Sequence, residues 1–131
     1  MSDADENALV RVEQLDKHYQ TGGEKLSILQ SISLSIWPGQ TVSIAGTSGC
    51  GKSTLLNMIS GLDSPSNGRV VVGDLDVSSL DERAAGYFRN QVLGMVFQAH
   101  HLLKEFTLLE NTAMPALIAG SNVKQAQARA K

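Results

Sequence analysis

The chain has 131 residues, of which 42% are hydrophobic and 18% charged, and its formal net charge is −2. This composition is typical of a single globular domain and excludes a disordered chain. Because the charge is small and the basic residues are scattered, we expect no binding to nucleic acid. The one cysteine, Cys50, fits a reducing compartment, since it has no partner for an internal disulfide.

The first ten residues, MSDADENALV, are acidic and polar and lack the basic and apolar regions of a signal peptide. No apolar run approaches the roughly 18 residues that a membrane-spanning helix needs. A role at a membrane would therefore depend on docking to a partner that spans it.

Residues 1–8 are expected to form a flexible tail, and the segments that follow have the patterns of strands and turns. A strand is predicted from about Leu9, and TGGE at residues 21–24 predicts a turn. In SISLSIWPGQTVSIAG, residues 31–46, apolar residues alternate with polar ones on both sides of a Pro-Gly pair. This alternation predicts two strands with a turn between them.

The rest of the chain predicts helices alternating with two short strands. In chain order these are a helix ending at Gly61, a strand at 70–72, a helix from Ser79 through about Arg89, an apolar strand at 92–98, a helix from Thr107 that Pro115 should kink, and a last helix capped by Ser121. The starts at Ser79 and Thr107 have glutamate three residues later, which is the capping-box pattern.

The stretch GTSGCGKST, residues 46–54, fits the Gly-x4-Gly-Lys-Ser phosphate loop between a predicted strand and a predicted helix. In such a loop, glycines let backbone N–H groups approach the phosphates, and the helix N-terminus faces the same anion. Lys52 would bridge the β- and γ-phosphates, and the Ser53 hydroxyl would coordinate Mg²⁺. The predicted nucleotide-binding residues here are Gly46, Thr47, Ser48, Gly49, Cys50, Gly51, Lys52, Ser53 and Thr54. The other interpretation is a glycine turn before a helix.

Four longer stretches resemble the ATP-binding subunits of ABC transporters. They are YQTGGEKLSILQSISLSIWPGQ, GTSGCGKSTLLNMISGLDSPSNGRV, LGMVFQAHHLL and FTLLENTAMPALIAG, and the resemblance runs from about Val10 to the last residue. It is greatest to the branch that includes the lipoprotein-releasing ATPase and related export ATPases. It implies a truncated α/β P-loop NTPase fold of the ABC-ATPase type, with an N-terminal antiparallel β region, the phosphate-loop strand and helix, and the start of the helical subdomain. Residues 9–131 would form this partial nucleotide-binding domain.

The resemblance also assigns roles to residues outside the phosphate loop. Tyr19 takes the place of the aromatic residue that stacks on adenine, and Gln98 that of the glutamine that contacts Mg²⁺ and the attacking water. Lys52 and Gln98 are thus the expected catalytic residues, with ATP and Mg²⁺ as cofactors. His100, Leu102, Leu103 and Phe106 are candidate residues for docking to a transmembrane permease, although packing within the helical subdomain explains the leucines and Phe106 equally well. The adjacent histidines at 100 and 101 have no further ligands nearby at metal-binding spacing, so we expect no metal site there.

Motifs that the family needs for hydrolysis are absent from this sequence. There is no LSGGQ signature, no switch histidine, and no apolar strand ending in Asp-Glu. VVVGD at 70–74 has no glutamate after its aspartate, and the resemblance assigns it to a hairpin, while SLDE at 79–82 is a helix start. In the family, two subunits arranged head to tail hold ATP between one subunit's loop and the other's signature. This chain alone is therefore expected to hydrolyse no appreciable ATP. An apolar sheet edge should also be exposed, because the phosphate-loop strand of such folds lies between parallel neighbours.

The leading expectation is the ATP-binding subunit of an ABC exporter that powers release or export of lipoproteins. It would be cytoplasmic and peripheral on the inner face of the cell membrane, held there by the permease. An ATPase for macrolide or peptide export shares most of these motifs and stays open. So does a truncated, non-catalytic remnant that at most binds nucleotide. A small kinase would need lid arginines, for which Arg83 and Arg89 are too isolated, and the base-reading motif of GTPases is absent.

Overall fold

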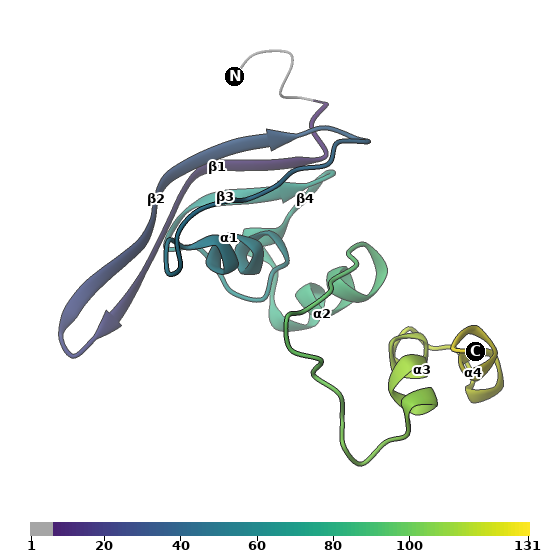
Figure 1. Ribbon diagram of the computed structural model, residues 1–131. Coiled ribbons are helices and arrows are strands. Elements are labelled where there is room, and N and C mark those ends of the chain that lie inside the picture. Colours follow the sequence, from purple (N-terminus) through teal and green to yellow (C-terminus); the bar gives the residue numbers. More distant parts are fainter. Residues whose placement is uncertain (1–6) are drawn as a thin grey trace. The chain divides into compact units, whose positions relative to one another are not determined.

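In the computed structural model, residues 7–131 are described, and the chain divides after Ala85 into two compact units. Of the tail expected over residues 1–8, residues 1–6 lie outside the described part, while Ala8 is buried. The elements in chain order are β1 (Val10–Thr21), β2 (Glu24–Ile36), α1 (Lys52–Ile59), β3 (Asn67–Val72), β4 (Leu75–Asp76), a 3₁₀ turn (Val77–Ser79), α2 (Glu82–Gln91), α3 (Leu108–Ile118) and α4 (Val123–Arg129) (Figure 1).

The first unit is an antiparallel sheet with the order β2-β1-β3-β4. The predicted turn at 21–24 is confirmed: Gly22 and Gly23 both have positive φ angles, 60° and 88°, which glycine adopts without a side-chain clash. The VVVGD stretch forms the β3–β4 hairpin, as the resemblance implied. The antiparallel β region and the helix after the glycine-rich loop are thus both present.

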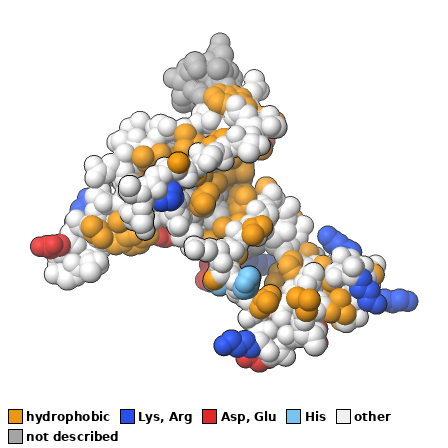
Figure 2. Space-filling model, in the orientation of Figure 1, with side chains coloured by type: hydrophobic (Ala, Val, Ile, Leu, Met, Phe, Trp, Pro, Cys, Tyr) orange, Lys and Arg blue, Asp and Glu red, His pale blue; other side chains and the backbone are white. Residues whose placement is uncertain are grey.

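Two predicted strands do not form. Residues 42–46 and 92–98 are irregular, and no described residue pairs with them as a strand. A strand of a parallel sheet is held by hydrogen bonds to neighbours, and local apolar alternation cannot replace them. Val42 is 51% and Phe97 45% exposed, so apolar side chains that a sheet would cover face solvent, but with no strand there the expected apolar sheet edge is not formed. Hydrophobic side chains are visible on the face of the molecule drawn in Figure 2.

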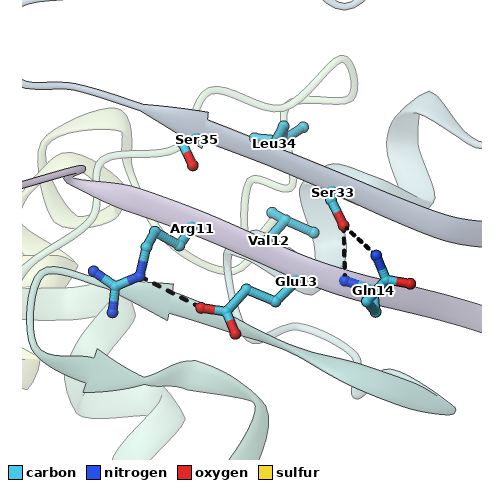
Figure 3. Close-up of a pocket in the computed structure, with 7 residues that line it drawn as sticks. All are labelled: Arg11, Val12, Glu13, Gln14, Ser33, Leu34 and Ser35. Atoms are coloured by element: carbon cyan, nitrogen blue, oxygen red, sulfur yellow. Dashed lines mark hydrogen bonds and ion pairs between the residues drawn. The ribbon is translucent and has the colours of Figure 1, made fainter. Parts of the chain in front are cut away.

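A β-bulge interrupts β1 at Glu13 and Gln14. The pairing of β1 with β2 jumps from Val12↔Leu34 to Leu15↔Ile32, so two residues of β1 face Ser33 alone. The Ser33 hydroxyl accepts hydrogen bonds from the backbone N–H and the side-chain amide of Gln14, at 3.0 and 3.1 Å (Figure 3). On the other side of β1, Gly68 of β3 lies against the carbonyl groups of the bulge.

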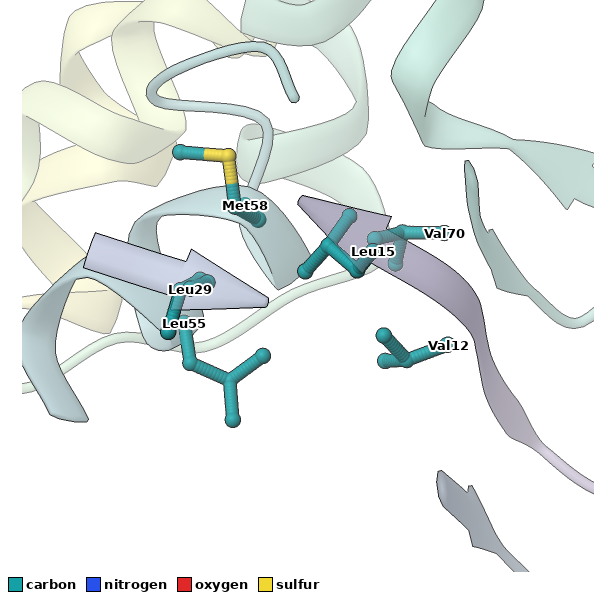
Figure 4. Close-up of a cluster of buried hydrophobic side chains, with 6 residues drawn as sticks. All are labelled: Val12, Leu15, Leu29, Leu55, Met58 and Val70. Atoms are coloured by element: carbon teal, nitrogen blue, oxygen red, sulfur yellow. The ribbon is translucent and has the colours of Figure 1, made fainter. Parts of the chain in front are cut away.

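One face of the sheet carries the hydrophobic core and is covered by α1. The core side chains are Val12, Leu15, Leu29 and Val70 from the strands and Leu55 and Met58 from α1 (Figure 4). Leu55 and Met58 are three residues apart and so lie on one helix face. Each buried side chain contributes about 2 kcal/mol, whereas solvent screens an ion pair at the surface such as Arg69–Glu13. Apolar packing therefore holds α1 on the sheet.

The helix starts differ in how closely they match their predicted caps. The Thr107–Glu110 capping box is confirmed: the Thr107 hydroxyl accepts from the Glu110 N–H, and the carboxylate of Glu110 accepts from the Thr107 N–H at 2.8 Å. These bonds from Thr107 lower the pKa of Glu110. α3 then continues through Pro115 to Ile118.

The caps predicted at Ser79 and Ser121 are wrong. The Asp81 carboxylate accepts from the Ala84 N–H at 2.7 Å at the start of α2, while Ser79 bonds within the preceding turn. Asn122, not Ser121, accepts from the Gln125 N–H at the start of α4. Aspartate and asparagine cap at least as well as serine, and both stand nearer the helix.

Replacing Gly68 by alanine should destabilise the protein by about 3 kcal/mol, because φ is +77° and the new Cβ would overlap the carbonyl groups of Glu13 and Gln14. Gly73→Ala is the matched control: its φ is +60°, but no atom lies within 4 Å of the new Cβ. We expect a loss of about 1 kcal/mol there. Urea unfolding followed by circular dichroism measures both, and equal losses would contradict the assigned clash.

Candidate functional site

The predicted phosphate loop leads directly into α1. Gly46, Gly49 and Gly51 have φ angles of 154°, 81° and 95°, in the region that favours glycine. A Cβ on Gly46 would lie 2.6 Å from the Cys50 Sγ, so the first glycine makes room for the thiol. The loop residues 46–50 are exposed, and α1 begins at Lys52.

Gly51 brings the end of the loop against β2. A Cβ at this position would lie 2.8 Å from Leu29 Cδ2 and 3.2 Å from the Ile28 carbonyl oxygen. Gly51 is the N-terminal cap of α1 and has no capping side chain. The first turn of α1 has no acidic residue, so no carboxylate of that turn competes with an anion for the helix N-terminus.

Lys52 bends back over its own loop. Its Nζ donates to the carbonyl oxygens of Gly46 at 3.0 Å and Thr47 at 2.7 Å, and lies 3.8 Å from the Cys50 Sγ. Cys50 is a free, exposed thiol, and Ser53 is exposed at the start of the helix. The loop thus offers an ammonium, a helix N-terminus and the exposed hydroxyl of Ser53, which fits a phosphate chain with its magnesium ion.

Tyr19 lies on β1 within a cluster of polar contacts. Its hydroxyl donates to Asp63 Oδ2 at 2.8 Å, and its ring centroid is 4.8 Å from the Nζ of Lys17. Lys17 is only 8% exposed; its Nζ donates to Asp63 Oδ1 and to the Ser64 carbonyl oxygen, both at 2.7 Å. Lys17 pairs with Leu29 in the sheet, and Leu29 lies beside Gly51, so the cluster and the phosphate loop belong to the same unit.

The cluster shifts the titration of its members. Burial raises the pKa of Asp63, but hydrogen bonds from Lys17, Tyr19 and the Ser64 N–H outweigh it and hold the pKa below its ordinary value of 3.8. The hydrogen bond to Asp63, then burial and the Asp63 charge, raise the pKa of Tyr19. Sequence reasoning missed Lys17 and Asp63. The available signal was a lysine at a core-facing position of β1, since Leu15 and Lys17 alternate toward the same face.

The remaining predicted residues lie in the second unit. Gln98 is exposed in the irregular segment between α2 and α3, and its role toward Mg²⁺ stays a prediction. His100, Leu102, Leu103 and Phe106 are all exposed. The ring of His101 packs edge-on against Phe97, with centroids 4.9 Å apart. The structure therefore brings Tyr19 into one unit with the loop and describes the docking candidates together in the other.

Asn111 of α3 closes the loop formed by residues 103–107. Its side-chain oxygen accepts from the Leu103 N–H at 2.8 Å. Its amide nitrogen donates to the carbonyl oxygens of Leu103, Phe106 and Thr107, each at 3.0 Å. These four hydrogen bonds fix the backbone of the 103–107 loop while its apolar side chains stay exposed.

A shallow groove of about 430 Å³ lies between β1 and β2, lined by Arg11, Val12, Glu13, Gln14, Ser33, Leu34 and Ser35 (Figure 3). It contains none of the predicted site residues. Over residues 7–131, no three His, Cys, Asp or Glu side chains gather in a way that could hold a metal ion. In the same range, no helix is both long and apolar enough to span a membrane.

Comparison with known proteins places these features in a family. The family model described as "ABC transporter" matches residues 29–131. The lipoprotein-releasing system ATP-binding protein LolD of Pseudomonas fluorescens is 47% identical over 125 residues, covering 95% of this chain and 55% of that protein. Its counterpart from Saccharophagus degradans is 52% identical over 115 residues, covering 88% of this chain and 50% of that protein. The chain thus spans about half the length of these relatives.

Two solved dimers of the ABC transporter cassette MJ0796 have the same fold. The post-hydrolysis state bound to ADP and Pi superimposes with a TM-score of 0.86 at 34% identity. A second dimeric structure superimposes with a TM-score of 0.85 at 32% identity. Each comparison covers 92% of this chain and 53% of the solved chain.

The Lys17–Asp63 pair should make the free energy of unfolding depend on pH in the acidic range. Because the pKa of Asp63 is lowered in the folded state, its charge stabilises the fold above the ordinary value of 3.8. That stability is lost as the pH falls through the lowered folded-state pKa. Asp63→Asn should destabilise the protein by about 1 kcal/mol at neutral pH and flatten this acid dependence. Urea unfolding at several pH values measures it, with the exposed Asp74→Asn as control; an unchanged slope in Asp63→Asn would contradict the assignment.

Proposed function

The chain belongs to the ABC transporter family, and from that membership we propose that residues 46–54 bind the phosphates of ATP together with Mg²⁺. The observation that carries this proposal is Lys52. Its ammonium is held over the loop by the carbonyl groups of Gly46 and Thr47, where an incoming phosphate can replace those weaker acceptors. The positive φ angles of the loop glycines and the unopposed N-terminus of α1 support it.

Each residue of the site has a separate task in this proposal. Lys52 binds the β- and γ-phosphates, and the backbone N–H groups of residues 46–51 surround them. The hydroxyl of Ser53 is the proposed ligand of Mg²⁺, with Gln98 as a second ligand that also orients the attacking water. Bound Mg²⁺ supplies charge neutralisation at the phosphates. The exposed ring of Tyr19 stacks on adenine. Because any base can stack on an aromatic ring, this contact adds affinity more than selectivity.

For the complete subunit we propose ATP hydrolysis coupled to the release of lipoproteins from the inner membrane. The lipoprotein-releasing relatives support the substrate class, and the dimeric cassettes support a second ATP-binding subunit as partner. The subunit would work on the cytoplasmic side, bound to transmembrane permease subunits. Its hydrolysis should need an apolar strand ending in Asp-Glu and a signature motif, neither of which occurs in this sequence. Phosphate release by this chain alone should therefore stay at the buffer rate.

For the permease contact we propose the 103–107 loop with its flanking residues. Leu102, Leu103 and Phe106 are 55%, 47% and 43% exposed, and His100 is exposed beside them in the sequence. The hydrogen bonds that Asn111 accepts from the Leu103 N–H and donates to the carbonyl oxygens of residues 103, 106 and 107 hold the backbone beneath Leu103 and Phe106. Exposed apolar side chains on a fixed backbone are typical of a protein contact.

Nucleotide binding is tested at Cys50, the single thiol. Mg-ATP should slow alkylation of Cys50, since phosphates on the loop cover the thiol next to Lys52. Lys52→Ala should weaken binding of a fluorescent ATP analogue at least about tenfold and remove the protection. Lys25→Ala, at an exposed lysine of β2, is the matched control and should retain both. Alkylation at one rate with and without Mg-ATP would refute the site.

Docking is tested by sedimentation with inner-membrane vesicles that contain the permease. The Leu103→Ser/Phe106→Ser double variant should bind at least about tenfold more weakly than the unaltered chain. Val123→Ser, at an exposed apolar residue of α4, should bind normally. Circular dichroism decides the alternative role: if the double variant loses helix content, the two side chains serve packing. Normal binding by a folded double variant would also reject the proposal.

A further inference from the structure

We propose that Lys17 and Asp63 are positioning residues that hold the Tyr19 ring as a one-sided platform for the base of the nucleotide. The inference rests on the proposed ATP site and adds two residues to it. Neither belongs to the phosphate loop, and both act through Tyr19.

Asp63 fixes the edge of the ring. An exposed tyrosine on an edge of a hairpin normally samples several rotamers, but the Tyr19 hydroxyl donates to Asp63 Oδ2 at 2.8 Å. The same carboxylate accepts from Lys17 at Oδ1, so both oxygens are occupied and the carboxylate itself cannot turn freely. The ring therefore keeps one orientation while Tyr19 remains 40% exposed.

Lys17 occupies one face of the ring. Its ammonium lies over the ring, 4.8 Å from the centroid, and is held there by Asp63 and the Ser64 carbonyl oxygen. A base cannot displace this buried, paired ammonium without leaving the Asp63 carboxylate uncompensated. The base must therefore stack on the opposite face, and the platform is one-sided.

Helix α1 joins the platform to the phosphate loop. The loop enters its N-terminus, and Asp63 follows four residues after its last residue, Ile59. The Asp63 N–H donates to the carbonyl oxygen of Asn57 within α1, at 3.3 Å, so Asp63 is tied to the helix end. Eight helical residues span about 12 Å, which makes α1 a rigid spacer between the phosphate and base positions.

The test compares ATP with inorganic tripolyphosphate, which shares the phosphate chain and lacks the base. Asp63→Ala should weaken ATP binding about fivefold, and Tyr19→Phe, which removes only the hydroxyl, about threefold. Tyr19→Ala should weaken it about tenfold. All three should bind tripolyphosphate as the unaltered chain does. Glu13→Ala, which removes an ion-paired carboxylate elsewhere on β1, is the matched control and should change neither affinity.

A double variant separates positioning from a purely structural role. Once Tyr19 is alanine, Asp63→Ala should weaken ATP binding no further, because Asp63 acts only through the ring. Equal losses for ATP and tripolyphosphate in Asp63→Ala would overturn the proposal, and so would additive losses in the double variant. If Asp63→Ala does not fold, Tyr19→Phe decides: unchanged ATP affinity there overturns it. Failure of the proposed ATP site is distinct, since the unaltered chain would then bind neither ligand.

Discussion

The absence of a side chain at position 51 is the constraint on which the first unit depends. The N-terminus of α1 reaches β2 only because nothing stands between the Gly51 Cα and the side chains of Ile28 and Leu29. With the helix at that distance, Leu55 and Met58 enter the core against the strands. A bulkier residue would lift the helix start, opening the core and shifting the loop together. Packing of the core and the position of the glycine-rich loop therefore share one requirement.

The Lys17–Asp63 pair adds a second, directional link between the same sheet and the same helix. The apolar core sets how closely α1 approaches the strands, but apolar contacts tolerate sliding. An ion pair with hydrogen bonds at 2.7 Å does not, because its strength depends on orientation. A buried ammonium is an expensive group to place in a small unit, since it loses hydration. We therefore interpret the core-facing Lys17 of β1 as fixing the position of the end of α1 relative to the sheet.

Features that depend on neighbours in the sequence were predictable. The Gly-Gly turn, the helix after the glycine-rich loop, and the Thr107–Glu110 cap all arise from residues within a few positions of one another. The strands expected at 42–46 and 92–98 have equally clear apolar patterns, yet they need hydrogen-bonded partners to exist. The apolar pattern identified segments that could form strands, but it could not show whether neighbouring strands would pair with them.

The core-facing position of Lys17 in β1 was a local signal, but nothing in the sequence pointed to Asp63 as its partner. Lys17 and Asp63 are 46 residues apart, and only the folded sheet brings them together. The glycine-rich loop before α1 was predictable because its motif is contiguous, while phosphate binding by its residues stays a prediction. The four bonds from Asn111 to the 103–107 loop span short distances in sequence, but asparagine in a helix has too many possible partners for the pattern to select one.

The folded-back position of Lys52 changes what any affinity for this loop means. In the proposed site, a phosphate would exchange with the carbonyl oxygens of Gly46 and Thr47, which accept hydrogen bonds from the ammonium of Lys52. The Lys52 side chain would therefore have lost much of its conformational entropy before a ligand binds. The same two bonds join the two ends of residues 46–52, so replacing Lys52 should also change the conformation of the loop itself. A measured binding free energy would therefore be the difference between Lys52 bonded to the loop carbonyl groups and Lys52 bonded to the phosphate.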